Sequence, residues 1–126
     1  MTRVVVAFCV LAVLFAGASA ATARVLRQGT DGADRIVGTS RSERLVGKGG
    51  KDVLIGNGGR DILIGDSGGD RLYGGSGKDT LLGGSGNDRL VGGPDADVIS
   101  CGAGRDTVVR GTGDRIASDC ERVISG

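Results

Sequence analysis

Apolar residues recur along this chain with a period of nine, not the two of a half-buried strand or the 3.6 of a helix. From Gly29 to Val109 the sequence divides without insertion into nine frames, each nine places long. Places one to six of each frame are rich in Gly, Asn, Asp and Ser, whereas places seven to nine are mostly apolar or β-branched. This pattern predicts a turn followed by a short strand in every frame.

Place eight is apolar in all nine frames. A strand of only three places is not stable alone, but stacked copies pair their backbones with the rungs above and below. We therefore predict a parallel stack with a buried place-eight row, formed by Ile36, Leu45, Leu54, Leu63, Leu72, Leu81, Leu90, Ile99 and Val108. Place nine should face the other way, either packed under the following turn or as an exposed apolar stripe that binds a partner.

Composition narrows the classes of function. The 126 residues include 26 Gly and no His or Trp, and the formal charge is +1 without a basic block. A His-based triad or a zinc site with His is therefore impossible, and nucleic acid is not an expected partner. Beyond Ala20 the single aromatic residue is Tyr73, so aromatic platforms for bases or sugars are excluded. We expect a protein that is not an enzyme.

The segment from Met1 to Ala20 resembles a secretory signal peptide. Arg3 precedes an apolar run from Val4 to Phe15, which is too short for a typical membrane span. Small residues predict cleavage after Ala20 or Ala23, and the alternative is an uncleaved anchor. Residues 21–28 form a lead-in that could supply the first strand or cap the first rung. We expect a secreted protein without a stable membrane span after leader removal.

An Asp stands at place six in eight of the nine frames. With glycines at places one, two and four, as in GGSGKDTLL and GGSGNDRLV, the phrase resembles the RTX (hemolysin-type) calcium-binding nonapeptide, G-G-x-G-x-D-x-U-x with U apolar. The resemblance implies an all-β, right-handed parallel β-roll over residues 29–109, with two frames per turn and Ca²⁺ between successive turns. The implied ligands are main-chain carbonyls of the turns, best matched at Gly75, Gly77, Gly84 and Gly86, and the carboxylates of Asp34, Asp52, Asp61, Asp70, Asp79, Asp88, Asp97 and Asp106.

With two frames per turn, alternate place-six residues share an edge, and neighbouring rungs lie about 4.8 Å apart. Unpaired carboxylates at that distance repel by roughly 3 kcal/mol per pair, and a divalent cation converts the repulsion into attraction. We therefore expect folding to be coupled to calcium. The alternative is a metal-free solenoid in which neighbouring cations neutralise part of the ladder: Arg35, Lys51, Arg60, Arg71, Lys78, Arg89 and Arg105.

The frames are not equivalent. The second frame has Arg41 at place four and Glu43 at place six, so it is expected to bind no ion. Asp95 at place four makes a site in the eighth frame doubtful. Place two is Gly only from the sixth frame onward, and Thr, which stands there in the first two frames, tolerates left-handed backbone poorly. The strongest sites are expected between Lys51 and Asp106.

After Val109 the repeat slips, and residues 110–126 are predicted to form a cap. Cys101 and Cys120 are 19 positions apart, close to the 18 of one full turn, which predicts a disulfide; the alternative is two free buried thiols. The Asp-Cys-Glu-Arg-Val ending is similar to that of small secreted calcium-binding proteins of actinobacteria. The expected function is a secreted, non-catalytic calcium-binding module with a structural or surface role, and the alternative is a metal-independent extracellular scaffold or adhesion protein.

Overall fold

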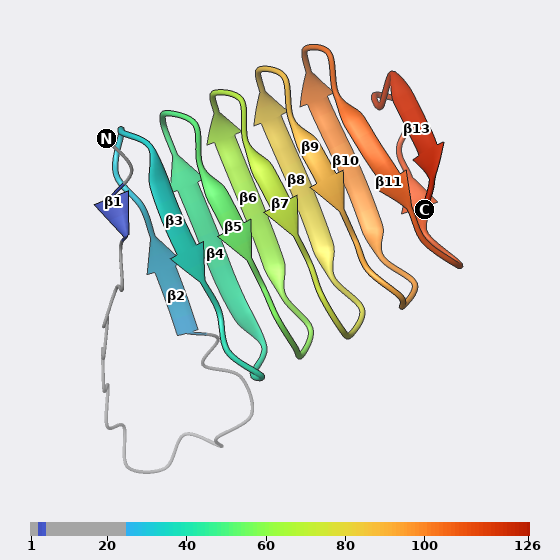
Figure 1. Ribbon diagram of the computed structural model, residues 1–126, viewed down its shortest axis with the longest axis horizontal. Coiled ribbons are helices and arrows are strands. Elements are labelled where there is room, and N and C mark those ends of the chain that lie inside the picture. Colours follow the sequence, from blue (N-terminus) through green and yellow to red (C-terminus); the bar gives the residue numbers. More distant parts are fainter. Residues whose placement is uncertain (1–2, 5–24) are drawn as a thin grey trace, which may run out of the picture.

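The computed structural model describes residues 3–4 and 25–126, and this part of the chain contains strands and turns but no helix. Figure 1 shows the strands following one another along a single axis in chain order, with β2 and β3 near one end and β13 at the other. The chain winds into a parallel β-solenoid of about six turns, each built from two frames. The predicted all-β solenoid is therefore confirmed.

Each turn contributes one strand to each of two sheets. The odd sheet contains β1 (Arg3–Val4), β3 (Asp34–Val37), β5 (Val53–Ile55), β7 (Arg71–Tyr73), β9 (Arg89–Val91), β11 (Thr107–Arg110) and β13 (Arg122–Ser125). The even sheet contains β2 (Val25–Gln28), β4 (Glu43–Lys48), β6 (Ile62–Ser67), β8 (Thr80–Ser85), β10 (Val98–Ala103) and β12 (Arg115–Ile116). All pairings are parallel, as the repeat predicts.

Stacked strands pair residues that occupy the same place in alternate frames. Leu54 pairs with Leu72, and Leu72 with Leu90, so identical places lie above one another along the axis. All nine place-eight side chains are fully buried, and together with Cys101 they form the core. Each buried aliphatic side chain contributes about 1.5–3 kcal/mol, so this narrow row is the main apolar contribution to stability.

The even strands are longer than predicted. β4, β6, β8 and β10 continue past place nine, because Lys48 pairs with Asp66, Asp66 with Gly84, and Gly84 with Gly102. The prediction of a turn over places one to six is therefore wrong for the start of these frames. Stacking in register allows the backbone to keep pairing where the local sequence favours a turn.

Places seven and nine share the outer faces of the sheets. Place nine is half-buried from Val46 onward, and Val37 is 39 % exposed. Neighbouring rungs cover these side chains partly, as in the stacked pair Ile55 and Tyr73. The apolar stripe therefore remains accessible along both faces instead of being packed under the following turn.

The two ends of the solenoid differ from its middle. β2, from the lead-in, pairs with β4, as expected for a first strand, whereas the pairing of β1 with β3 was not predicted. The rest of the predicted leader, with both cleavage sites, lies outside the described residues. At the other end the register shortens by one position where Val98 pairs with Arg115, which confirms the predicted slip. Within the described ranges no helix has the length and apolarity needed to cross a membrane.

Candidate metal centre

The place-six carboxylates form two rows inside the turns, one at each edge of the solenoid. The odd row contains Asp34, Asp52, Asp70, Asp88 and Asp106, and the even row Glu43, Asp61, Asp79 and Asp97. Every one of them is at most 3 % exposed. Each residue begins or directly precedes a strand whose register is fixed by the place-eight core, so apolar stacking brings the acidic groups together.

From the third frame onward, one oxygen of each place-six carboxylate accepts a backbone hydrogen bond from the turn before it. The place-six N–H of one turn donates to Oδ1 of the Asp one turn later, at 2.8 Å, for example from Asp52 to Asp70 and from Asp79 to Asp97. The same bond repeats along both rows. The carboxylate therefore replaces a missing backbone carbonyl, which gives the Asp a structural role of its own.

The second oxygen is different. Among the described residues, Oδ2 is buried without a hydrogen-bond partner in Asp52, Asp70, Asp79, Asp88, Asp97 and Asp106, as is Oδ1 in Asp34. A buried carboxylate oxygen without a partner is strongly unfavourable, because it has lost its hydration and gained nothing in return. Such a row of unpartnered oxygens is the arrangement that a bound cation would stabilise.

The pKa values express the same cost. Burial raises the pKa of Asp70 and Asp79 to about 7 and that of Asp88 to about 6, from an ordinary value of 3.8. Backbone hydrogen bonds lower each pKa partly, and the neighbouring Asp residues of the row raise it again. Burial is likewise the largest cause of the raised pKa of Asp52, Asp97 and Asp106. Without a cation, Asp70, Asp79 and Asp88 are therefore only partly ionised near neutral pH.

Main-chain carbonyls lie beside the second carboxylate oxygen. A Cβ added to Gly74 would lie 2.6 Å from both Asp79 Oδ2 and the Gly92 carbonyl oxygen, and one added to Gly83 would lie 2.7 Å from Asp88 Oδ2 and 2.5 Å from the Cys101 carbonyl. In the first eight frames place one therefore requires Gly for space, not for a positive φ, whereas Cys101 stands there in the ninth frame. The place-one carbonyls were missed by the sequence analysis, because only the stacking of turns shows which carbonyl faces which carboxylate.

The four predicted glycine ligands adopt left-handed backbone. The φ angles are +94° for Gly75, +103° for Gly77, +100° for Gly84 and +118° for Gly86. Each Cα packs against a main-chain carbonyl one turn earlier, in contact that leaves no room for a Cβ. These contacts explain why these two frames have glycine at places two and four, whereas the role of the four residues as ligands stays a prediction.

The first two frames close on themselves. Thr30 donates both its N–H and its Oγ1 hydroxyl to Asp34 Oδ2, the latter at 2.9 Å. Glu43 accepts from the Thr39 N–H and forms an ion pair with Arg27, with 3.0 Å between Arg27 Nη2 and Glu43 Oε1. Both oxygens of Glu43 thus have partners, which supports the prediction that the second frame binds no ion.

The eighth frame and the cap hold two further carboxylates. Asp95 Oδ2 accepts from the Gly77 N–H at 2.7 Å and so replaces the usual glycine contact at place four. Asp114 extends the even row: its Oδ1 accepts from the Asp97 N–H at 3.0 Å, and its Oδ2 from the Gly111 N–H at 2.6 Å. Asp114 was not predicted as a site residue, although the Gly-Thr-Gly-Asp sequence preceding β12 marks it as a shortened frame.

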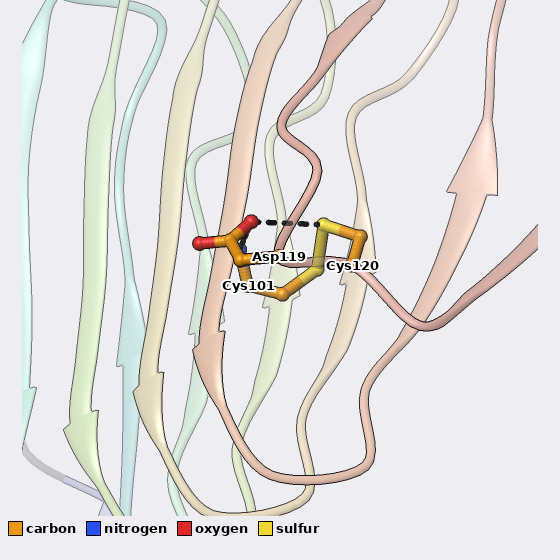
Figure 2. Close-up of side chains that lie close together, drawn as sticks. All are labelled: Cys101, Asp119 and Cys120. Carbon is orange, nitrogen blue, oxygen red and sulfur yellow. Dashed lines mark hydrogen bonds between the residues drawn. A yellow bond between two sulfur atoms is a disulfide. The ribbon is translucent and has the colours of Figure 1, made fainter.

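The predicted disulfide is present and closes the last turn. Cys101 and Cys120 are joined with an S–S distance of 2.05 Å and a Cα–Cα distance of 5.1 Å. Figure 2 shows Asp119 beside the bridge, with its Oδ1 3.6 Å from Cys120 Sγ. Asp119 accepts from Ser100 Oγ at 2.8 Å and from the Cys101 and Gly102 N–H groups, and the Ser100 bond is the largest cause of its lowered pKa.

Within the described residues, three acidic or cysteine ligand atoms gather within 4.8 Å only at Cys101, Asp119 and Cys120. Those sulfurs are committed to the disulfide and are not thiolate ligands. The carboxylate rows therefore form no cage of side chains alone, and a cation there would need backbone oxygens as well. A donor set of carboxylates and main-chain carbonyls matches the hard-oxygen preference of Ca²⁺.

The cations beside the ladder do not neutralise it. In the described part of the chain the one ion pair is Arg27–Glu43, so none of the seven Lys and Arg residues that flank ladder Asp residues forms one. These cations are exposed on the surface, whereas the carboxylates are buried. Among the described residues, the odd row from Asp34 to Asp106 thus has no internal counter-ion.

Comparison with known proteins agrees with this geometry. The family model of the RTX calcium-binding nonapeptide repeat matches in four copies, over residues 28–42, 37–72, 73–108 and 82–116. No curated protein and no solved structure matches the chain. The matched residues cover more than half of the chain and include both carboxylate rows. The chain belongs to the RTX calcium-binding nonapeptide repeat family.

Proposed function

We propose that this protein is a secreted, non-catalytic structural module that binds calcium between its turns and becomes fully ordered when it does so. The observation that carries the proposal is the set of buried carboxylate oxygens without partners, of which Asp70, Asp79 and Asp88 are examples. A bound Ca²⁺ supplies positive charge and accepts six to eight oxygen ligands. The ladder Asp residues and the carbonyls beside them, such as that of Gly92, would hold it.

The donor set favours calcium over other metal ions. The chain has no His, and its two described cysteines form a disulfide, so nitrogen and sulfur ligands are absent from the described site. Mg²⁺ demands a small, near-ideal octahedral site and keeps several of its waters, whereas Ca²⁺ tolerates many backbone oxygens in irregular geometry. A row of carbonyls and carboxylates in stacked turns fits the larger ion.

Calcium binding and folding should be one event. The carboxylates of a row become neighbours only when the chain winds, and at neutral pH their mutual repulsion and burial oppose winding. An ion that binds the wound chain and not the unwound one shifts the equilibrium by mass action. We therefore expect a chain that is loosely ordered in chelator and rolled in millimolar calcium.

Calorimetric titration and circular dichroism of the leader-free protein test this proposal. Calcium should give saturable heat and increase the β-sheet signal, whereas magnesium at the same concentration should do neither. The Asp70→Asn/Asp79→Asn variant should bind fewer ions. Identical spectra in calcium and chelator, with no titration heat, would reject the proposal.

The second candidate is a metal-independent scaffold. It is favoured by the hydrogen bonds from each place-six N–H to the next Oδ1, which give the Asp ladder a purpose without any ion. This candidate predicts an unchanged melting temperature when chelator replaces calcium. A calcium-dependent rise in the melting temperature decides against it.

Export and lack of catalysis belong to the same proposal. The disulfide between Cys101 and Cys120 supports an oxidising compartment, and the sequence from Met1 to Ala20 supports a cleaved leader. The absence of His removes the commonest general base. Mass spectrometry of the protein recovered from the culture medium should show an N-terminus at Ala21 or Arg24; a full-length chain retained in cells would contradict export.

A further inference from the structure

A basic groove runs over the odd edge of the solenoid. It encloses about 640 Å³ and is lined by residues of the third, fifth, seventh and ninth frames, at β5, β7, β9 and β11. Four of the lining residues are exposed cations: Lys51, Arg71, Arg89 and Arg105. Four successive turns contribute one of these cations each, so the groove presents one positive charge per turn.

These charges are available to a ligand. Within the described ranges none of the four cations forms an ion pair. The carboxylates of Asp52, Asp70 and Asp88 also line the groove, but each is at most 3 % exposed, whereas the four cations are exposed. Calcium on those carboxylates would cancel their charge and leave the cations as the dominant field.

The shape and chemistry of the groove select an extended anion. Rungs of a sheet lie about 4.8 Å apart, so the four cations extend over roughly 14 Å along the axis. Guanidinium groups bind sulfate, phosphate and carboxylate through paired, charge-assisted hydrogen bonds. The lining contains no aromatic residue, so neither stacked bases nor the faces of uncharged sugars have a platform there. The feature that remains for the groove to recognise is a ligand with negative charges repeated along its length.

We propose that this groove binds an anionic polysaccharide laid along the solenoid axis, with Lys51, Arg71, Arg89 and Arg105 contacting successive charged groups. Calcium strengthens this binding by neutralising the buried carboxylates of the same groove, and this second statement rests on the proposed function. The module would then attach to a negatively charged glycan surface in the presence of calcium.

Dextran sulfate and its uncharged parent dextran are the probes, measured by calorimetry on the leader-free protein in excess calcium. The Arg71→Gln/Arg89→Gln variant should bind dextran sulfate at least about tenfold more weakly, since bonds to charged donors are the strong ones. The matched control is Arg60→Gln/Lys78→Gln, which removes the same charge from turns of the even frames and should change affinity by less than about twofold, as expected of a distant surface charge. Circular dichroism and calcium titration of both variants verify that they remain folded.

The possible outcomes distinguish a failure of the groove proposal from a failure of the calcium proposal. Equal losses in the two variants, equal binding of uncharged dextran, or equally tight binding of single-stranded DNA through the same Arg residues would each overturn the polysaccharide proposal. If calcium binds and orders the protein but dextran sulfate does not bind, the groove proposal fails while the proposed function stands. If dextran sulfate binds through Arg71 and Arg89 while calcium neither binds nor strengthens it, the proposed function and the calcium dependence fail and the groove stands.

Discussion

The first two frames and the seven that follow build the same rung from different turns. In the first two, Thr30 and Thr39 stand at place two and donate their backbone N–H groups to the place-six carboxylate of the same frame. Their hydroxyls in turn accept from the place-four N–H groups of Gly32 and Arg41, both at 3.2 Å. One oxygen of Asp34 and one of Glu43 is thus bound within its own frame, which closes the turn.

From the third frame onward place two is left-handed, with φ of +80° at Lys48, +73° at Asn57 and +81° at Asp66, and glycine in the later frames. Only glycine, and less readily Asn or Asp, adopts this geometry without strain. The turn then leaves the second carboxylate oxygen open at Asp52, Asp70, Asp79, Asp88, Asp97 and Asp106. The comparison shows that place two decides whether the turn binds the carboxylate of its own frame.

The largest difference in stability between the first two frames and the later ones should come from substitution of the glycine at place four. Gly77→Ala forces an L side chain into φ of +103° and places its Cβ against the Gly59 carbonyl. We expect the free energy of unfolding to fall by about 3 kcal/mol or more, of which the strain of the left-handed backbone accounts for about 1–2 kcal/mol. The same change at Gly32, where a Cβ meets only Thr30 Oγ1 at 3.7 Å, should be neutral or stabilise by up to about 1 kcal/mol. Denaturant unfolding in calcium measures both. Equal costs would show that the two turns are not different.

The pH dependence of the calcium-free protein tests the open frames as a group. The folded-state pKa of Asp70 and Asp79 is raised to about 7 and that of Asp88 to about 6. A raised folded pKa means that stability is fully present below the unfolded pKa near 4 and is lost as the pH rises through 6 to 7. We expect the melting temperature in chelator to fall by about 5 °C or more between pH 4 and pH 7.5. Calcium at pH 7.5 should restore it; a melting temperature in chelator that rises with pH would contradict this account.

Single substitutions at place six should distinguish a carboxylate that has an unpartnered oxygen from one whose two oxygens both have partners. Asp70→Asn keeps the acceptor for the Asp52 N–H but removes a charge, so it should weaken calcium binding about tenfold, or about 1.4 kcal/mol, and stabilise the calcium-free protein at pH 7. Glu43→Gln should leave the calcium titration unchanged. It should lower the free energy of unfolding by about 1–3 kcal/mol, because Arg27 loses the negative charge that it pairs with. A weaker calcium titration for Glu43→Gln would show that the second frame binds an ion after all.

The smallest effect should come from the hydroxyl that helps to close the first frame. Thr30→Val removes the 2.9 Å bond to Asp34 Oδ2 and the acceptor of the Gly32 N–H, at a cost of about 1 kcal/mol. Thr107→Val, at a half-buried position on β11, serves as the control and should be close to neutral. Chemical unfolding in calcium measures both. A neutral Thr30→Val would mean that the backbone N–H alone closes the turn.

The repeat predicted much of this molecule because each residue has the same surroundings in every turn. A period of nine with one fixed apolar place is sufficient to predict the buried row from Ile36 to Val108, the stacking of alternate frames and the two rows of carboxylates. The spacing of Cys101 and Cys120 predicted their bridge for the same reason. The different behaviour of Thr30 and Asn57 at place two also followed from backbone sterics alone.

The sequence by itself determined which residues repeat, which place is apolar and where the acidic groups recur, because these depend on chemical identity and spacing. Only the tertiary structure decided that the even strands extend to Lys48 and Ser67, that the carbonyl of Gly92 faces Asp79, that Asp114 continues a row, and that four cations line one groove. Those features depend on contacts between residues one turn apart. Such contacts exist only after winding has fixed which atoms of one turn lie against which atoms of the next.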